Sequence, residues 1–271
     1  MRGALAAVNR SLLATARPPS SPPTSATLGR PHRRALYPRQ GVAAAPSAAA
    51  SASVAMATDP SSHANFGDVR VTRAAFELDV DFGRRVLEGF VTLTAAVEAE
   101  AGAAELVLDS RDLHVTGVWH INGPDETKLE WSFGEKHEVL GTPLRVRLPA
   151  GLSKGSSISV GVRFATSPAS SAIQFLEPQQ TAGGQHPYLF TQCQAIHARA
   201  LVPCQDSPGA KMSYSAVVRV PTELTALMSA VPKDDTSAGV PHLANVLPSA
   251  AGHKLFAFEQ AIPIPPYLIA L

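Results

Sequence analysis

Alternation of apolar and polar residues is the feature of this chain that most limits how it can fold. From about residue 68 onwards the pattern has a period of two, and Phe76, Leu78 and Val80 alternate with Glu77 and Asp79. Successive side chains of a β-strand point to opposite faces of a sheet, so this alternation predicts a half-buried strand. Comparable segments cover residues 91–97, 105–109, 113–121, 129–133, 144–148, 158–164, 212–220, 224–231 and 254–260.

Turn-forming residues separate these segments, and none of the segments has the periodicity of an amphipathic helix. Phe82-Gly83-Arg84-Arg85 predicts a turn after the first strand, and Asn122-Gly123 is a hairpin signal. Residues 231–252 are expected to form a surface loop. Roughly ten strands at short spacing predict an all-β fold, either an antiparallel sandwich or a curved sheet.

Composition excludes several classes of protein. With 45% hydrophobic residues, 17% charged residues and a mean hydropathy of +0.05, the chain of 271 residues is typical of a globular protein. It has no apolar run of about 18 residues, so we expect no transmembrane helix and no membrane partner. Seven arginines in residues 1–58 leave 16 basic against 22 acidic residues in the remainder, and that charge of about −6 argues against a nucleic-acid partner.

Residues 1–58 have the composition of a targeting segment. They are rich in Ala, Ser, Pro and Arg, contain no acidic residue, and lack the long apolar core of a secretory signal. We therefore predict a disordered, transit-peptide-like segment in residues 1–58 that directs the protein to a plastid or mitochondrion, followed by a folded domain in residues 59–271. Translation from Met56 would give a cytoplasmic form, and an untargeted disordered tail is the alternative.

The usual catalytic motifs are absent from the chain. No two of the nine histidines are four residues apart, and Gly141 stands where a zinc helix starting at His137-Glu138 needs its second histidine. Two cysteines, Cys193 and Cys204, cannot build a disulfide framework and suit a reducing compartment. We expect Cys193 to be a buried structural thiol rather than a nucleophile. The sequence thus predicts no catalytic residue, no metal site and no cofactor in this chain.

Gln192 and Gln194 flank Cys193 and are the candidate binding residues. In an extended strand their side chains would share one face, where two amides suit a polar cleft that binds a peptide terminus. Hydrogen bonding of both glutamines to neighbouring loops is an equally weighted alternative on spacing alone. Arg199, Asp206 and Lys211 follow among turn-forming prolines, and we expect them to have a structural role in ion pairs and capping.

A longer motif surrounds these residues and resembles a known family. Arg199, Pro203, Cys204, Asp206, Pro208 and Lys211 match the R-x-x-x-P-C-x-D-x-P-x-x-K corner of the aminopeptidase N-like zinc peptidases, or gluzincins. The preceding HPYLFTQCQAIHAR is similar to the leukotriene A(4) hydrolase and aminopeptidase B-like branch. The resemblance runs from about Val71 to Leu271, through residues 107–113, 164–172, 227–230 and 262–271.

The resemblance implies an all-β, saddle-like, mainly antiparallel β-sandwich that forms the N-terminal domain of such an enzyme. By the same resemblance, Gln192 and Gln194 would contact the substrate backbone and its amino-terminal end. In full-length members, zinc is held by a following catalytic domain that carries G-x-M-E-N and H-E-x-x-H. Neither motif occurs in this chain, so we expect a form truncated before the catalytic domain that alone binds no zinc and has no peptidase activity.

Two functions remain open at this point. The first is the substrate-cleft domain of a zinc metallo-aminopeptidase and epoxide hydrolase, with two partners: the amino terminus of a peptide substrate and the catalytic domain of the same or a paralogous chain. The alternative is a non-catalytic β-sandwich that binds peptides or regulates a full-length paralogue. An in-frame H-E-x-x-H beyond codon 271 would favour the enzyme, whereas a genuine stop would favour the binding module.

Overall fold

The computed structural model describes residues 59–235, His242 and residues 252–271. The predicted targeting segment 1–58 and residues 236–241 and 243–251 of the predicted loop lie outside the described residues and stay predictions. Residues 231–233 of that loop form a strand, which corrects the start of the predicted loop. The strands are β1 (Val69–Asp81), β2 (Val86–Val97), β3 (Glu105–Leu108), β4 (His114–Asn122), β5 (Asp125–Lys128), β6 (Trp131–Phe133), β7 (Leu144–Arg147), β8 (Ser157–Ala165), β9 (Ile173–Leu176), β10 (Tyr188–Thr191), β11 (Met212–Pro221), β12 (Val231–Lys233) and β13 (His253–Ile264). Single-turn 3-10 helices are η1 (Pro178–Gln180), η2 (Ala198–Ala200) and η3 (Pro266–Leu268).

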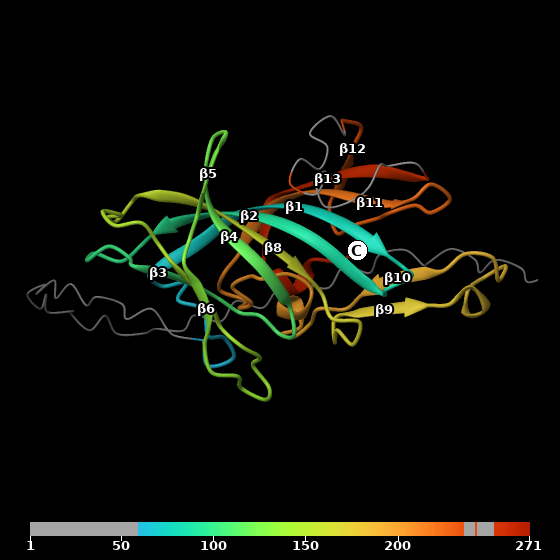
Figure 1. The fold of residues 1–271 in the computed structure, drawn as a ribbon, viewed down its shortest axis with the longest axis horizontal. Coiled ribbons are helices and arrows are strands. Elements are labelled where there is room, and N and C mark those ends of the chain that lie inside the picture. Colours follow the sequence, from blue (N-terminus) through green and yellow to red (C-terminus); the bar gives the residue numbers. More distant parts are fainter. Residues whose placement is uncertain (1–58, 236–241, 243–251) are drawn as a thin grey trace, which may run out of the picture. The chain divides into compact units, whose positions relative to one another are not determined.

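An eight-stranded sheet in the order β12-β13-β11-β1-β2-β8-β4-β5 forms the framework (Figure 1). Its neighbours pair antiparallel except β1 and β11, which run parallel from Arg73 opposite Ser213 to Asp79 opposite Arg219. Strands β3, β7 and β6 form a second, antiparallel sheet, and β9 and β10 form a separate hairpin. The predicted all-β, mainly antiparallel fold class is confirmed.

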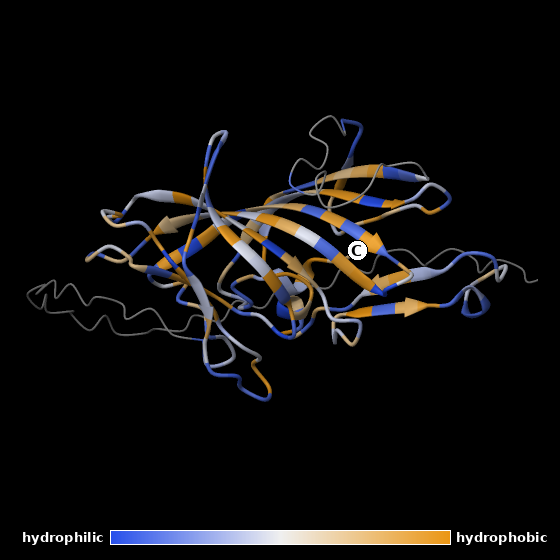
Figure 2. Ribbon diagram, in the orientation of Figure 1, coloured by the Kyte–Doolittle hydropathy of each residue, from blue (hydrophilic) through white to orange (hydrophobic). Residues whose placement is uncertain are grey.

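One hydrophobic core lies between the large sheet and the three-stranded sheet. Phe76 and Leu78 of β1 belong to the same buried cluster as Leu106 of β3 and Leu144 of β7. Figure 2 shows the corresponding alternation of apolar and polar residues along the strands of the large sheet. Burial of these side chains contributes roughly 25 cal/mol per Å² of apolar surface removed from water, which is why the period-two pattern fixes the inner face of each strand.

The outer face of the large sheet departs from the simple alternation at Asp79. Asp79 lies on the predicted polar face of β1, yet it is only 6% exposed and its carboxylate lies 2.5 Å from Nε of Arg219. These residues are register partners across the parallel β1–β11 pair, so their side chains share one face. The partner lies far away in sequence, and the local pattern therefore could not indicate the burial of Asp79.

The segment from Leu224 to Ala230 is not a strand, which corrects the prediction for residues 224–231. Its side chains do alternate, with Ala226 buried and Leu227 exposed. However, its backbone bonds to turns and to the end of the chain rather than to a ladder, since Leu224 N–H donates to Pro221 O and Ser229 N–H donates to Ala270 O. Apolar alternation here reflects an irregular segment packed on the core.

The predicted turns are confirmed. Residues 82–85 connect β1 and β2, and Arg84 donates to Asp81 through its backbone N–H at 2.8 Å and its Nε at 2.6 Å. Asn122 pairs with Asp125 across the β4–β5 hairpin, and Gly123 between them has φ +60°, a left-handed conformation that glycine adopts without steric cost.

Candidate functional site

Gln192 lies directly after β10 in an irregular segment, and Gln194 begins the turn that follows, so neither residue is in a strand. β10 ends at Thr191, and residues 194–197 form a turn that leads into η2. The expected strand is therefore wrong at these two positions, where the backbone N–H of Gln194 donates to Gln192 Oε1 at 2.9 Å instead of to another strand. The Gln194–Ala195 peptide bond is cis.

The two glutamines are both exposed but differ in how their amides are used. The Gln192 backbone N–H donates to Ala172 O at 2.8 Å, and its side-chain oxygen is engaged with Gln194 N–H. Within the described part of the chain, the Gln194 side chain makes no hydrogen bond, so both its donor and its acceptor are available to a ligand. Geometry thus separates a positioning residue, Gln192, from a candidate contact residue, Gln194.

Cys193, between the glutamines, points into the core. It is 2% exposed, and burial, together with the charge of Asp206, raises the pKa of its thiol to about 12. Cys204 is also buried, and burial raises the pKa of its thiol well above the ordinary range. Both cysteines are free. A thiolate is the nucleophilic form of cysteine, so Cys193 is a structural thiol as predicted.

A fully buried guanidinium holds the segment that follows the glutamines. Arg199, on η2, is 0% exposed, and its Nε lies 3.0 Å from Oδ2 of Asp206, which also accepts the Arg199 backbone N–H at 3.1 Å. The two Nη atoms donate to the carbonyl oxygens of Leu140 at 2.9 Å, Ser61 at 2.8 Å and Asp206 at 3.0 Å. A buried charge requires this degree of pairing and hydrogen bonding.

Asp109 is the second carboxylate beside Arg199, and sequence analysis did not identify it. Its Oδ1 lies 3.5 Å from Nη1 of Arg199 and accepts the backbone N–H of His63 at 2.8 Å. Its Oδ2 accepts the Ser62 hydroxyl at 2.5 Å and the backbone N–H of Asp206 at 2.9 Å. Asp109 is one of two acidic residues in the 107–113 motif, but its partners lie 46 to 97 residues away.

The residues that follow Arg199 in the sequence motif have a structural role. The side chain of Gln205 acts like a backbone peptide group, because its Oε1 accepts Val71 N–H at 2.9 Å and its Nε2 donates to Val69 O at 2.7 Å. Burial raises the pKa of the Asp206 carboxyl, and the Arg199 guanidinium opposes that effect. Lys211 is exposed. The expected ion pairing is therefore found for Arg199 and Asp206, while Lys211 is located at the surface.

The last residues of the chain lie beside the glutamine segment. Thr191 N–H donates to Leu271 O at 3.1 Å, and Leu271 N–H donates to the Thr191 hydroxyl at 3.0 Å. On the other side, Ala270 N–H donates to the Ser229 hydroxyl at 2.9 Å, which also bonds to the Tyr214 hydroxyl at 2.9 Å. These bonds hold Leu271 beside Thr191, the residue that precedes Gln192.

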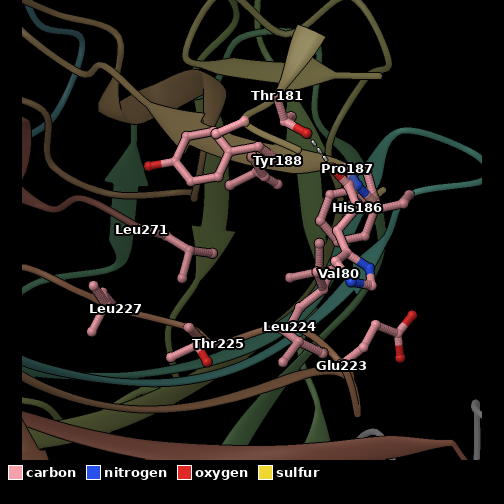
Figure 3. Close-up of a pocket in the computed structure, with 15 residues that line it drawn as sticks. Val80, Thr181, His186, Pro187, Tyr188, Glu223, Leu224, Thr225, Leu227 and Leu271 are labelled. Atoms are coloured by element: carbon pink, nitrogen blue, oxygen red, sulfur yellow. Dashed lines mark hydrogen bonds between the residues drawn. The ribbon is translucent and has the colours of Figure 1, made fainter. Parts of the chain in front are cut away.

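A cavity of about 400 Å³ opens next to Leu271. Figure 3 shows Leu271, Leu227 and Tyr188 on one side of it, with His186 and Glu223 at another. Tyr188 is 56% exposed and Leu227 is 70% exposed, so this surface is apolar but accessible. The cavity depends on segments that are brought together only by folding.

Neither a metal cluster nor a spanning helix is found in the described ranges. Residues 59–235, 242 and 252–271 contain no group of three or more His, Cys, Asp or Glu side chains placed to hold a metal ion. In the same ranges, no helix is long and apolar enough to cross a membrane. His114 and His120 both lie on β4, separated by five residues of strand.

Comparison with known proteins gives a consistent result for this domain. Residues 68–268 match the family described as the Peptidase M1 N-terminal domain. The chain is 41% identical over 213 residues to leukotriene A-4 hydrolase of Xenopus laevis, covering 79% of this chain and 33% of the relative. It is 35% identical over 217 residues to leucine aminopeptidase 2 of Sclerotinia sclerotiorum, covering 80% and 34%. The chain thus spans about a third of the length of these relatives.

Solved structures share the same fold. Yeast leukotriene A4 hydrolase in complex with bestatin superimposes with a TM-score of 0.66 at 29% identity, over 80% of this chain and 30% of that chain. An M1 zinc metallopeptidase from Deinococcus radiodurans gives a TM-score of 0.56 at 22% identity, over 75% and 41% of the two chains, and supports the fold alone.

Removing the buried guanidinium should unfold the corner. Arg199→Met leaves the carboxylates of Asp109 and Asp206 buried without their counter-ion, and we expect a loss of about 3–5 kcal/mol in the free energy of unfolding. Urea denaturation measures this loss. The control is Arg147→Met, because Arg147 is 77% exposed in its pair with Glu130 and should cost at most about 1 kcal/mol. Equal losses in the two variants would contradict the central role of Arg199.

Both thiols should resist modification while the protein is folded. At about pH 8, a pKa of about 12 leaves roughly one Cys193 in ten thousand as thiolate, and burial blocks access as well. A colorimetric disulfide reagent should therefore label neither cysteine of the native protein within minutes, and both after addition of concentrated guanidinium chloride. Rapid native labelling of Cys193 would show that the residue is accessible and reactive.

Proposed function

The chain belongs to the peptidase M1 family through its N-terminal domain, and we propose that it forms the substrate-cleft domain of a zinc aminopeptidase of the leukotriene A(4) hydrolase type. In this proposal the domain recognises the amino-terminal end of a peptide substrate. Removal of amino-terminal residues is then carried out by a catalytic domain of the same or a paralogous chain. Hydrolysis of a lipid epoxide by the same catalytic domain is part of this proposal.

The exposed, unengaged amide of Gln194 beside the end of the chain carries the proposal. In a longer chain, the segment after Leu271 would begin beside Thr191, the residue that precedes Gln192. The relatives are about three times as long as the part that they share with this chain. A domain following Leu271 would therefore be positioned with Gln194 at its edge, as a shared cleft requires.

Gln194 could bind a peptide amino end by ordinary hydrogen bonding. Its side-chain oxygen accepts from a protonated amine, and its NH₂ group donates to a substrate carbonyl. Gln192 would act as a positioning residue because it holds the Gln194 backbone N–H. A peptide bound this way has its first residue fixed, which is what selective removal of that residue needs.

Zinc in such an enzyme would be supplied from outside this domain. When bound, the metal polarises the scissile carbonyl and activates water. A catalytic zinc site takes three protein ligands, and the described residues offer no such group, so the donor set of this domain does not fit the metal. Its proposed contribution is limited to binding and orientation of the substrate.

A non-catalytic binding module is the second candidate. It is favoured by the accessible apolar surface around the 400 Å³ cavity, where Tyr188 and Leu227 are exposed. Such a surface fits another protein domain as well as it fits the remainder of a longer chain. The transcript beyond codon 271 distinguishes the two candidates, because an in-frame H-E-x-x-H motif supports the enzyme and a genuine stop supports the module.

Substitution of Gln194 tests the substrate contact in a fusion of this domain to a matching M1 catalytic half. Losing a hydrogen bond to a charged amino end costs about 1.5–3 kcal/mol, so Gln194→Ala should lower kcat/KM roughly ten- to a hundredfold with Tm unchanged. Gln192→Ala should lower both kcat/KM and Tm, because it also removes the acceptor of Gln194 N–H. Aminoacyl reporter hydrolysis and thermal denaturation give the two readouts.

Gln174→Ala is the matched control, since Gln174 is an exposed glutamine of the adjacent β9–β10 hairpin, opposite Phe190. It should change neither kcat/KM nor Tm. If Gln194→Ala behaves like this control, or loses stability while its turnover is unchanged, the substrate contact is wrong and the glutamine segment is scaffold only.

We further propose that residues 1–58 direct the protein to an organelle and that a form starting at Met56 remains in the cytoplasm. The acid-free, arginine-containing composition supports this proposal. Fusion of residues 1–58 to a fluorescent protein should give signal in plastids or mitochondria, whereas a fusion starting at Met56 should be diffuse. Diffuse signal from both fusions would rule out the targeting role.

A further inference from the structure

A row of charged and aromatic side chains crosses the large sheet on the face opposite the main core. Glu77 of β1 is the register partner of Phe90 of β2, and Phe90 is the register partner of Arg163 of β8. Register partners share one face of a sheet, and the neighbouring positions Phe76, Val91 and Val162 face the core. These three side chains therefore form a continuous strip on the outer face.

Aromatic packing gives the strip a flat floor. The Phe90 ring lies over Gly161, where an added Cβ would come within 2.5 Å of the ring, and it contacts Trp119 at 5.8 Å between ring centroids. The Arg163 guanidinium lies 5.6 Å from the centre of the Trp119 ring. Glycine at position 161 is thus what lets an aromatic ring lie flat on the sheet here.

The His242 side chain occupies this floor. Its ring stacks on Phe90 with a centroid distance of 3.9 Å and an interplanar angle of 2°. Nδ1 bonds to the Glu77 carboxylate, and Nε2 lies 3.2 Å from Oε1 of Glu126 on β5. The His242 backbone is held too, since its N–H donates to Glu77 at 3.0 Å and its carbonyl accepts from Arg163 at 2.6 Å.

The two carboxylates place a requirement on the protonation of the ring. A neutral imidazole has one N–H donor, whereas both ring nitrogens of His242 face carboxylate oxygens, which only accept. An imidazolium donates from Nδ1 to Glu77, and its charge is also attracted to the Glu126 carboxylate near Nε2. The charged groups around the ring are Glu77 from β1, Glu126 from β5 and Arg163 from β8, and the Arg163 guanidinium is directed at the His242 carbonyl rather than at the ring.

We propose that Glu77, Glu126 and the ring of Phe90 form a binding site for an imidazolium on the outer face of the large sheet, and that His242 is its ligand. Protonation strengthens this attachment and loss of the proton weakens it. The backbone hydrogen bonds of His242 and the stacking on Phe90 do not depend on the proton, so residue 242 keeps a basal attachment at alkaline pH.

The direction of the pH dependence follows from which form is bound. The charged ring is attracted to the carboxylates of Glu77 and Glu126, whereas a neutral ring is not. The stabilisation that His242 contributes should therefore be larger in mildly acidic solution than in alkaline solution.

Thermal denaturation of the 271-residue chain tests the proposal. We expect His242→Ala to lower Tm by about 2–4 °C more at about pH 5.5 than at about pH 8, the shift typical of one lost charged contact in a domain of this size. His253→Ala is the matched control, because His253 is an exposed histidine at the start of β13. Its effect on Tm should not change with pH.

A carboxylate pair of variants completes the test. Glu126→Gln keeps an acceptor but removes the charge, and it should lower Tm more at about pH 5.5 than at about pH 8. Asp125→Asn, the neighbouring exposed acid on β5, should show no such difference. Equal losses for His242→Ala at both pH values, or the same pH profile in the control variants, would overturn the imidazolium site.

Discussion

The guanidinium of Arg199 is the interaction on which this domain depends. A charge that is 0% exposed must be fully paired, and its partners lie in four parts of the chain: Ser61, Asp109, Leu140 and Asp206. The loop after β3, the loop before β7, the segment before β1 and the turn after η2 are thereby fixed to one point. Hydrophobic burial supplies most of the stability, whereas this network decides which loops meet.

Two anchors with different physical origins hold the glutamine segment. On one side Thr191 exchanges hydrogen bonds with Leu271, and on the other side η2 is locked by Arg199. Cys193 is buried between these anchors and turns the neighbouring glutamines outwards. An exposed amide on a rigid support loses little conformational freedom when it binds a ligand, which suits the proposed contact by Gln194.

Local patterns predicted the framework but not the contacts between distant parts. Period-two alternation located β1, β2, β8 and β11, because burial of one sheet face is a local constraint. It failed at residues 224–231, where an irregular segment on the core shows the same alternation. The strand expected at Gln192 and Gln194 was also wrong, because β10 ends at Thr191. Pairing of Asp79 with Arg219 and the role of Asp109 depend on register between remote strands, which one sequence does not encode locally.

Attachment of residues 61–63 to the corner limits how the amino-terminal segment can be processed. Ser61 O accepts from Arg199, while the Ser62 hydroxyl and His63 N–H both donate to Asp109. A processing protease that cuts before Asp59 leaves all of these bonds in place, and so does initiation at Met56. Cleavage a few residues later would remove hydrogen-bond partners of the buried Arg199 and Asp109 side chains. Any cleavage that leaves the buried ion pair intact must therefore fall before Ser61.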